Sequence, residues 1–195
     1  GSAIQNDIYE YIKNLKSDAL QNDRTVLTNY NLELDVYIPS KNLAFELDGI
    51  FWHSYNRKET PKEKQYHRKK QELCLTENIN LIRILETEWN DHNEIVKSKI
   101  NNLLGLNTTI YARNCIIKNV NKLEEKQFLK TNHIQGYTRS TVSIGCYLND
   151  ELIAITTLGD SRFDKSYEWE ILRIASKMNV NVIGGLSKMF KYFIC

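Results

Sequence analysis

Cysteine is scarce in this chain of 195 residues, which has four cysteines and no C-x-x-C pair. The wide spacing of Cys74, Cys115, Cys146 and Cys195 argues against a zinc knuckle and against a disulfide framework. Reduced thiols are typical of intracellular proteins, so the cysteine pattern predicts a cytoplasmic location.

Long hydrophobic runs are also missing, because no apolar stretch approaches the roughly 18 residues that a membrane-spanning helix needs. The sequence therefore predicts neither a signal peptide nor a membrane span. A hydrophobic content of 42% and a charged content of 26% are ordinary for a globular protein. The length allows one large or two small domains. The net charge of +2 says little about partners, whereas the placement of the charges says more.

A β-hairpin is predicted on either side of the turn Pro39–Asn42. Apolar side chains alternate with other residues before and after this turn, at Leu34, Val36 and Ile38 and at Leu43, Phe45 and Leu47. Such alternation is typical of two strands that share one apolar face.

The opposite face of the hairpin carries Glu33, Asp35 and Tyr37 on the first strand, and Ala44, Glu46 and Asp48 on the second. If the strands close symmetrically about the turn, Asp35 lies opposite Glu46 and diagonal to Asp48. Three neighbouring carboxylates repel one another, and Mg²⁺, which prefers hard oxygen ligands, would relieve the repulsion. The alternative is a solvated outer face with scattered acids.

A basic segment follows the hairpin, with seven basic and two acidic residues between Arg57 and Lys70. Thr60 and Pro61 are typical of the cap and first turn of a helix, which continues to about Thr76. This helix is either a solvated surface or a surface that holds a polyanion against the acidic hairpin. The candidate DNA contacts are Arg57, Lys58, Arg68, Lys69 and Lys70.

Two histidines accompany these elements, His53 after the second strand and His67 inside the basic helix. Carboxylates that hold a metal, together with an imidazole that activates or orients water, are sufficient to hydrolyse a phosphodiester. A structural role is the alternative for each histidine.

The remaining periodicity predicts two α/β domains, residues 1–105 and 110–195. The first begins with an amphipathic helix from Ile4 to about Leu15, with Gln5 on the flank of its apolar stripe. The apolar run Ile79–Leu85 predicts a strand buried on most sides, and residues 91–104 a closing helix. Leu106–Thr109 is predicted to be a polar linker. In the second domain, strands are expected at 115–120, 142–148, 152–158 and 168–175, and helices at 122–131 and 186–195.

Three segments of the first domain resemble the very short patch repair endonucleases and, more closely, related phage and homing endonucleases of the PD-(D/E)XK nuclease superfamily. They are LELDVYIPSKNLAFELDGIFWHS from residue 32, YHRKKQELC from residue 66 and LIRILETEW from residue 81. The resemblance covers about residues 2–104. It implies a restriction-endonuclease-like core, a phage- or bacterium-encoded intracellular protein, duplex DNA as substrate, and Mg²⁺ or Mn²⁺ as cofactor.

The same resemblance implies roles for single residues. Asp35 would be the principal metal ligand, and Glu46 and Asp48 would shape the rest of the site, although Asp48 stands where the superfamily often has lysine. His53 would act as the acid/base or water-orienting group. Trp52, with Phe51, would stack on or wedge bases, the alternative being ordinary core packing.

Gln5 departs from the family pattern, since relatives usually carry glutamate at this position of the first helix. A neutral amide cannot supply the charge of a carboxylate, so metal binding or catalysis should weaken. Either this branch tolerates glutamine, or the chain is a deliberately inactivated variant.

The second domain resembles the core of GNAT-type acyltransferases, in which a glycine loop at a helix N-terminus cradles a pyrophosphate. The loop here would be Gly184-Gly185, which a tight turn explains equally well. The predicted order ends on a helix with no following strand, which is unlike a complete acyltransferase core. A DNA-contacting or interaction role is therefore favoured, with Arg139, Arg162, Lys165 and Lys177 as candidate phosphate contacts.

The sequence as a whole predicts a metal-dependent endonuclease acting on duplex DNA, of phage or mobile-element type. The alternatives are a catalytically inactive DNA-binding module and a GNAT-like modifier of nucleic acid.

Overall fold

The computed structural model describes residues 2–49 and 61–194. The chain is a mixed α/β protein with three sheets, in which helices and strands are interleaved. Its residues group into two compact units, Gly1–Asn93 and Glu94–Cys195. The helix at 93–104, which the sequence analysis assigned to the first domain, groups with the second unit. Within the described ranges, none of the helices has the length and apolar character needed to cross a membrane.

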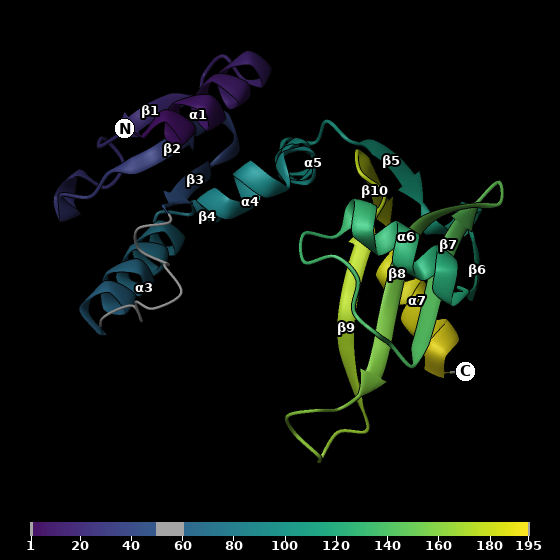
Figure 1. Ribbon diagram of the computed structural model, residues 1–195. Helices are drawn as coiled ribbons and strands as arrows, with labels where there is room; N and C mark the ends of the chain where they lie inside the picture. Colours follow the sequence, from purple (N-terminus) through teal and green to yellow (C-terminus); the bar gives the residue numbers. More distant parts are fainter. Residues whose placement is uncertain (1, 50–60, 195) are drawn as a thin grey trace. The chain divides into compact units, whose positions relative to one another are not determined.

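The elements of each unit follow one another along the chain (Figure 1). The first unit contains α1 (Ala3–Leu15), β1 (Leu20–Asp23), β2 (Leu34–Ile38), β3 (Leu43–Asp48), α3 (Pro61–Thr76), β4 (Asn80–Leu85) and α4 (Glu86–Asp91). The second contains α5 (Asn93–Leu104), β5 (Thr108–Tyr111), β6 (Ile116–Asn119), α6 (Lys122–Asn132), β7 (Val142–Leu148), β8 (Glu151–Asp160), β9 (Trp169–Ser176), β10 (Val180–Ile183) and α7 (Gly185–Ile194).

The sheet of the first unit has the strand order β1-β2-β3-β4. Strands β2 and β3 form the predicted antiparallel hairpin, with Val36 opposite Phe45 and Ile38 opposite Leu43. The next pair in this register is Asp35 and Glu46, as the alternation predicted. Strand β4 then pairs with β3 in parallel, which places Arg83 beside Glu46.

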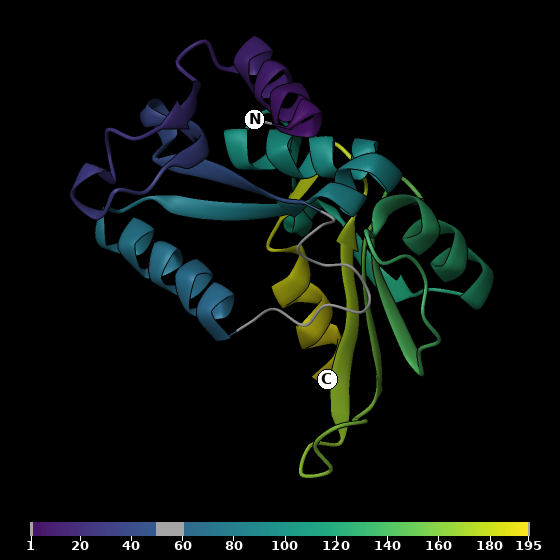
Figure 2. The same cartoon turned by 60° about the vertical axis from the view of Figure 1, so that its left-hand side comes forward.

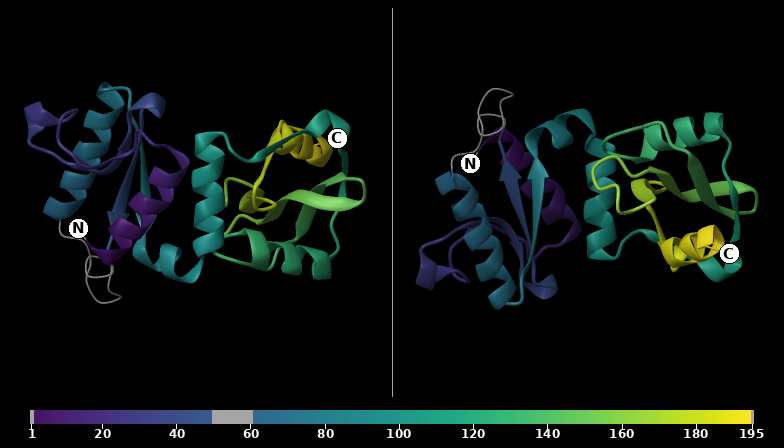
Figure 3. Two further views of the ribbon diagram at one scale, coloured as in Figure 1. Left: turned by 90° about the horizontal axis from the view of Figure 1, so that it is seen from above. Right: turned by 90° about the horizontal axis from the view of Figure 1, so that it is seen from below.

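Both faces of this sheet are covered, which corrects the expectation of one apolar and one polar face. Helix α1 covers one face, and its Ile8 and Ile12 are fully buried. Helix α3 covers the other, where Cys74 packs with Tyr37 and Ala44. Figure 3 shows the strands between the two helices. The alternative of a solvated acidic face is therefore wrong.

Strand β4 is less buried than predicted, because it lies at the edge of the sheet. Leu81 and Ile84 are buried, whereas Arg83 and Leu85 are exposed. An apolar run of this length fits a central and an edge strand equally, so the run alone did not distinguish them.

The second unit is built on the antiparallel sheet β6-β7-β8-β9. Leu129 of α6 packs with Leu152 and Ile155 on one face, and Met189 of α7 packs with Ile144 on the other (Figure 2). A separate pair, β5 with β10, runs parallel. The linker predicted at Leu106–Thr109 is wrong in this respect, because β5 begins at Thr108.

Asparagine forms many of the tight turns. Among the described residues, six asparagines have φ angles between 46° and 62°, in the left-handed region: Asn31, Asn42, Asn78, Asn149 and Asn179 in turns, and Asn22 inside β1. Among residues other than glycine, asparagine enters this region most readily because its short polar side chain can hydrogen-bond locally. Asn42, which closes the predicted hairpin turn, is one example.

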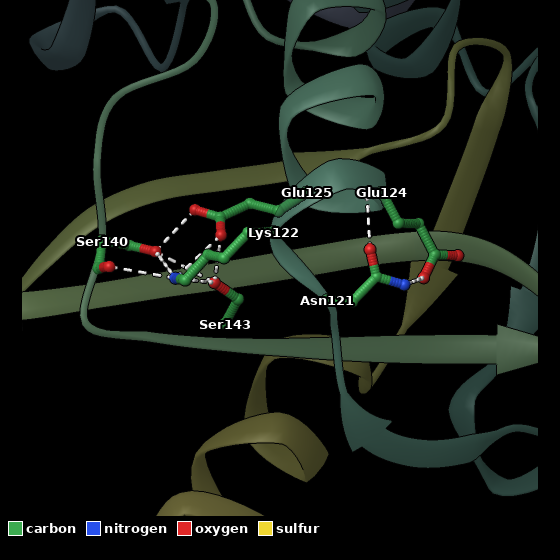
Figure 4. Close-up of polar contacts among 6 residues, drawn as sticks. All are labelled: Asn121, Lys122, Glu124, Glu125, Ser140 and Ser143. Atoms are coloured by element: carbon green, nitrogen blue, oxygen red, sulfur yellow. Dashed lines mark hydrogen bonds and ion pairs between the residues drawn. The ribbon is translucent and has the colours of Figure 1, made fainter.

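A buried carboxylate fastens the start of α6 to β7 (Figure 4). Glu125 is fully buried. Its carboxylate accepts hydrogen bonds from Ser140 Oγ at 2.5 Å and Ser143 Oγ at 2.7 Å, and Lys122 Nζ lies 3.0 Å away. Lys122 also donates to the carbonyl oxygen of Ser140 at 2.9 Å. The Glu125 carboxylate thus links α6 to β7 and to the segment before β7 that contains Ser140.

We expect Glu125→Ala to lower the free energy of unfolding by about 3 kcal/mol, because two buried hydroxyls and an ammonium lose their acceptor. Urea denaturation measures the change. Lys126→Ala, at the next and exposed position, should leave stability within about 0.5 kcal/mol of the parent. A loss below about 1 kcal/mol for Glu125→Ala would contradict this account.

Candidate functional site

Two carboxylates lie side by side at the centre of the first unit. The Asp35 N–H donates to Glu46 Oε1 at 3.2 Å, and the Leu47 N–H donates to Asp35 Oδ2 at 2.8 Å. The side chains come from adjacent strands whose register the hairpin turn fixes. This pair is the nucleus of the candidate site.

Lys70 supplies a positive charge to this pair. Its Nζ lies 2.6 Å from Glu46 Oε2, and the side chains of Lys70 and Glu46 are 6% and 16% exposed. Lys70 precedes Cys74 by one helical turn, so both point from α3 toward the sheet. Lys70 was predicted to contact DNA, but it is buried inside the unit.

Asp48 has a partner of its own, although its charge still helps to raise the pKa of Asp35. Arg83 Nη2 lies 2.7 Å from Asp48 Oδ1, and Asp48 is buried. Across residues 2–49 and 61–194, no three histidine, cysteine, aspartate or glutamate side chains are placed to share a metal ion. The structure thus joins Asp35 with Glu46 and does not join Asp48 to them.

Burial makes the pair difficult to ionise fully. It raises the pKa of the Glu46 carboxyl to about 7, with the Asp35 charge adding to the effect and Lys70 opposing it. Burial also raises the pKa of Asp35, although the Leu47 N–H and Lys70 act in the other direction. When both groups are ionised, the site holds surplus negative charge that a cation would offset.

Gln5 of α1 lies near this pair. It lines a cavity of about 10 Å³ together with Asp35 and Glu46, close to the volume that one water needs. Its Nε2 donates to Asn22 Oδ1 at 2.9 Å. The rest of the cavity lining is apolar, from Ile8, Val36, Phe45, Leu47 and Ile84. The oxygens of the two carboxylates and of the Gln5 amide are hard donors of the kind that Mg²⁺ or Mn²⁺ prefers, and together they carry one charge less than three acids.

The other predicted site residues divide into two groups. Trp52, His53, Arg57 and Lys58 lie outside the described residues. On α3, His67 is half-buried one turn before Lys70, and its ring lies 5.6 Å from that of Tyr66. Arg68 is exposed and paired with Glu72 at 2.8 Å, and Lys69 is exposed. Among the described basic candidates, Arg68 and Lys69 therefore remain on the surface.

Sequence reasoning missed two cations. The inward orientation of Lys70 could have been found from its helical spacing to Cys74. Arg83 is the one charged residue in the apolar run Ile79–Leu85, and parallel pairing places it opposite Glu46. A single charge within an apolar strand is a usable signal, because an opposite charge is expected close to it, and here that charge is Asp48.

The glycine loop of the second unit is explained by its backbone. Gly184 has a φ of +76°, and a Cβ at Gly185 would lie 2.9 Å from Val182 Cγ1. Both glycines are thus required by the turn and by packing. Of the proposed phosphate contacts, Arg162 pairs with Glu170 and Lys177 with Glu151. Lys165 donates to the Ser161 carbonyl oxygen, and Arg139 is exposed.

The raised carboxyl pKa of Glu46 predicts a pH dependence of stability. The unfolded state loses this proton near the ordinary value of about 4.5, and the folded state near 7. Between these values the folded state binds more protons, so stability falls as the pH rises. Asp35→Asn removes the charge that opposes Glu46 ionisation and keeps an acceptor for the Leu47 N–H.

In metal-free buffer we therefore expect Asp35→Asn to melt at a higher temperature than the parent at pH 8, with a smaller difference at pH 5. Asp7→Asn, an exposed position on α1, is the matched control and should follow the parent. Thermal melts across this range measure the effect, and identical pH profiles for parent and Asp35→Asn would count against it.

Substitution of Lys70 and of its neighbour Lys69 tests whether the Lys70 side chain points into the unit. We expect Lys70→Met to lower the free energy of unfolding by about 2 kcal/mol, because Glu46 loses its ionic partner. This loss is smaller than for many broken buried ion pairs, since Glu46 can take up a proton and become neutral. Lys69→Met, one residue earlier and exposed, should change it by less than about 0.5 kcal/mol. Equal effects of the two substitutions on urea denaturation would refute the buried pair.

Comparison of this chain with protein-family models, with curated proteins and with solved structures found no match.

Proposed function

We propose that the chain is a metal-dependent DNA endonuclease that hydrolyses phosphodiester bonds of duplex DNA. The observation that carries the proposal is the half-buried Asp35–Glu46 pair, whose Glu46 contacts Lys70 and which shares one cavity with Gln5. Two carboxylates held close together away from water cost stability, and a divalent cation, which suits two acids on adjacent strands, would offset their charge.

The order of elements supports the same proposal. A helix, three antiparallel strands, a second helix and a strand parallel to the third follow one another in the first unit. This order, with acids on the two middle strands, resembles the PD-(D/E)XK nuclease core. We assign the first unit to that core and the second to a GNAT-like accessory domain, on resemblance alone.

Asp35, Glu46 and the Oε1 of Gln5 would hold Mg²⁺ or Mn²⁺, which when bound polarises the phosphate and lowers the pKa of an attacking water. Lys70 Nζ holds Glu46 Oε2 in place and brings an ammonium to the site from α3. The superfamily often has lysine at the position of Asp48, and here Lys70 would take over that charge. Asp48, paired with Arg83, would then shape the site without binding the metal.

Residues around this pair would contact the substrate. His53 would orient or activate water, with His67 one turn from Lys70 as the second candidate. Exposed Lys69 and Arg68, together with Arg57 and Lys58, would contact phosphates in a sequence-independent way. Trp52 would stack on bases. A phage or mobile-element origin accords with the resemblance.

A catalytically inactive DNA-binding module is the second candidate, and the Gln5 side chain favours it. Its amide lacks charge and is already bonded to Asn22. The third alternative, a GNAT-like modifier, has less support because the turn itself accounts for both glycines.

Cleavage of supercoiled plasmid during a Mg²⁺ titration separates the candidates. We expect Gln5→Glu to raise the rate at least about tenfold, a barrier change of about 1.4 kcal/mol, because it restores the third negative charge. It should also lower the Mg²⁺ concentration for half-maximal rate. Asp35→Asn should abolish cleavage and leave DNA binding nearly intact.

Gln21→Glu is the matched control, since it adds the same charge on β1 without lining the cavity. Equal rates for parent and Gln5→Glu at every Mg²⁺ concentration would place Gln5 outside the site. Cleavage by Asp35→Asn within a few-fold of the parent would overturn the assignment of the metal ligands.

A further inference from the structure

The second unit contains a larger pocket that no part of the proposed nuclease site uses. Its volume is about 400 Å³, and its lining comes from α5, the end of α6, β9 and the segment that leads into β10. This volume lies within the range of about 300–1,000 Å³ that is typical of small-molecule sites. The pocket is therefore large enough for a ligand rather than for water alone.

One part of the lining is apolar. Ile95 from α5, Ile174 from β9, and Met178 and Val180 beyond β9 contribute to it. Ile174 is 44% exposed, which is high for isoleucine in a strand. A surface of this kind offers contact to the face of a planar ring, the part of a nucleotide that gains most from leaving water.

A second part of the lining is rich in amides. Asn102 and Asn181 line the pocket, and neither side chain has a hydrogen-bond partner among residues 2–49 and 61–194, so their donors and acceptors are available. Carboxamides pair with the edges of nucleobases because each offers one donor group and one acceptor.

His133 adds a neutral donor to this part of the pocket. Its Nδ1 accepts from the Gln135 N–H at 3.1 Å, so the proton of the neutral ring lies on Nε2. Burial, with help from Arg173 and Lys99, lowers the pKa of His133. The ring therefore donates one hydrogen bond at neutral pH.

The charges of the lining have one sign. Lys99 and Lys177 line the pocket, and aspartate and glutamate are absent from its lining in the part of the unit that the structure describes. Lys177 is held by Glu151, whereas Lys99 has no ion-pair partner among the described side chains. An ammonium at the rim, with no acid beside it, suits a phosphate.

We propose that this pocket binds a nucleoside phosphate, with the base against the apolar wall, its edge on the asparagines and its phosphate near Lys99. The ligand is either a free nucleotide or one unstacked nucleotide of a DNA strand. Only the second source rests on the proposed endonuclease function. In that case the second unit selects DNA that exposes a base outside its stack.

The test is calorimetric titration of the full chain in EDTA with the four deoxynucleoside 5′-monophosphates. We expect binding of at least one of them, weakened about fivefold or more by Lys99→Ala, which removes one charge contact. Asn102→Asp should weaken it further by placing an acid in the lining. Lys130→Ala and Asn114→Asp, at exposed positions outside the pocket, are the matched controls and should bind as the parent does.

Three results would overturn the proposal: no heat with any mononucleotide at millimolar concentration, equal losses for Lys99→Ala and Lys130→Ala, or ribose 5-phosphate binding as tightly as the nucleotides. Competition by a duplex with one unpaired nucleotide, and not by a fully paired duplex, identifies DNA as the source. If neither duplex competes with the mononucleotide, the ligand is the free nucleotide.

The outcome is independent of the nuclease assay. Nucleotide binding without any Mg²⁺-dependent cleavage would reject the endonuclease function alone, and cleavage without nucleotide binding would reject this pocket alone.

Discussion

Two carboxylates held side by side in a protein interior repel each other, and much of the first unit is arranged to offset that repulsion. The hairpin register places Asp35 against Glu46, α3 brings Lys70 to Glu46, and parallel β4 brings Arg83 to Asp48. Apolar residues of similar size would fill the same space at less cost in desolvation. Because of this excess cost, we propose a chemical task for the pair.

The parts of this arrangement that depend on local pattern could be predicted from the sequence. Strand alternation about Pro39–Asn42 fixes which side chains face each other, so the pairing of Asp35 with Glu46 followed directly. Helical spacing likewise predicted α1, but it placed Gln5 at the flank of the apolar stripe, whereas the structure buries Gln5 together with Ile8 and Ile12. Each of these inferences uses residues within one or two turns or strands of each other.

The parts that depend on packing between distant elements could not be predicted in this way. Lys70 belongs by composition to a basic surface, and only the docking of α3 turns it inward. Strands β5 and β10 pair in parallel although they lie far apart in the chain, and β5 by itself resembles a polar linker. The pocket of the second unit is assembled from several such elements, none of which shows its role alone.

The asparagine turns have a chemical consequence for the first unit. Asparagine is among the residues that heat damages, and its conversion to aspartate would put a new negative charge into a turn. Asn22 shares this left-handed conformation but lies inside β1, and its Oδ1 accepts the hydrogen bond from Gln5. Ageing of this one residue would therefore place a negative charge directly beside the Gln5 amide without any change in the gene.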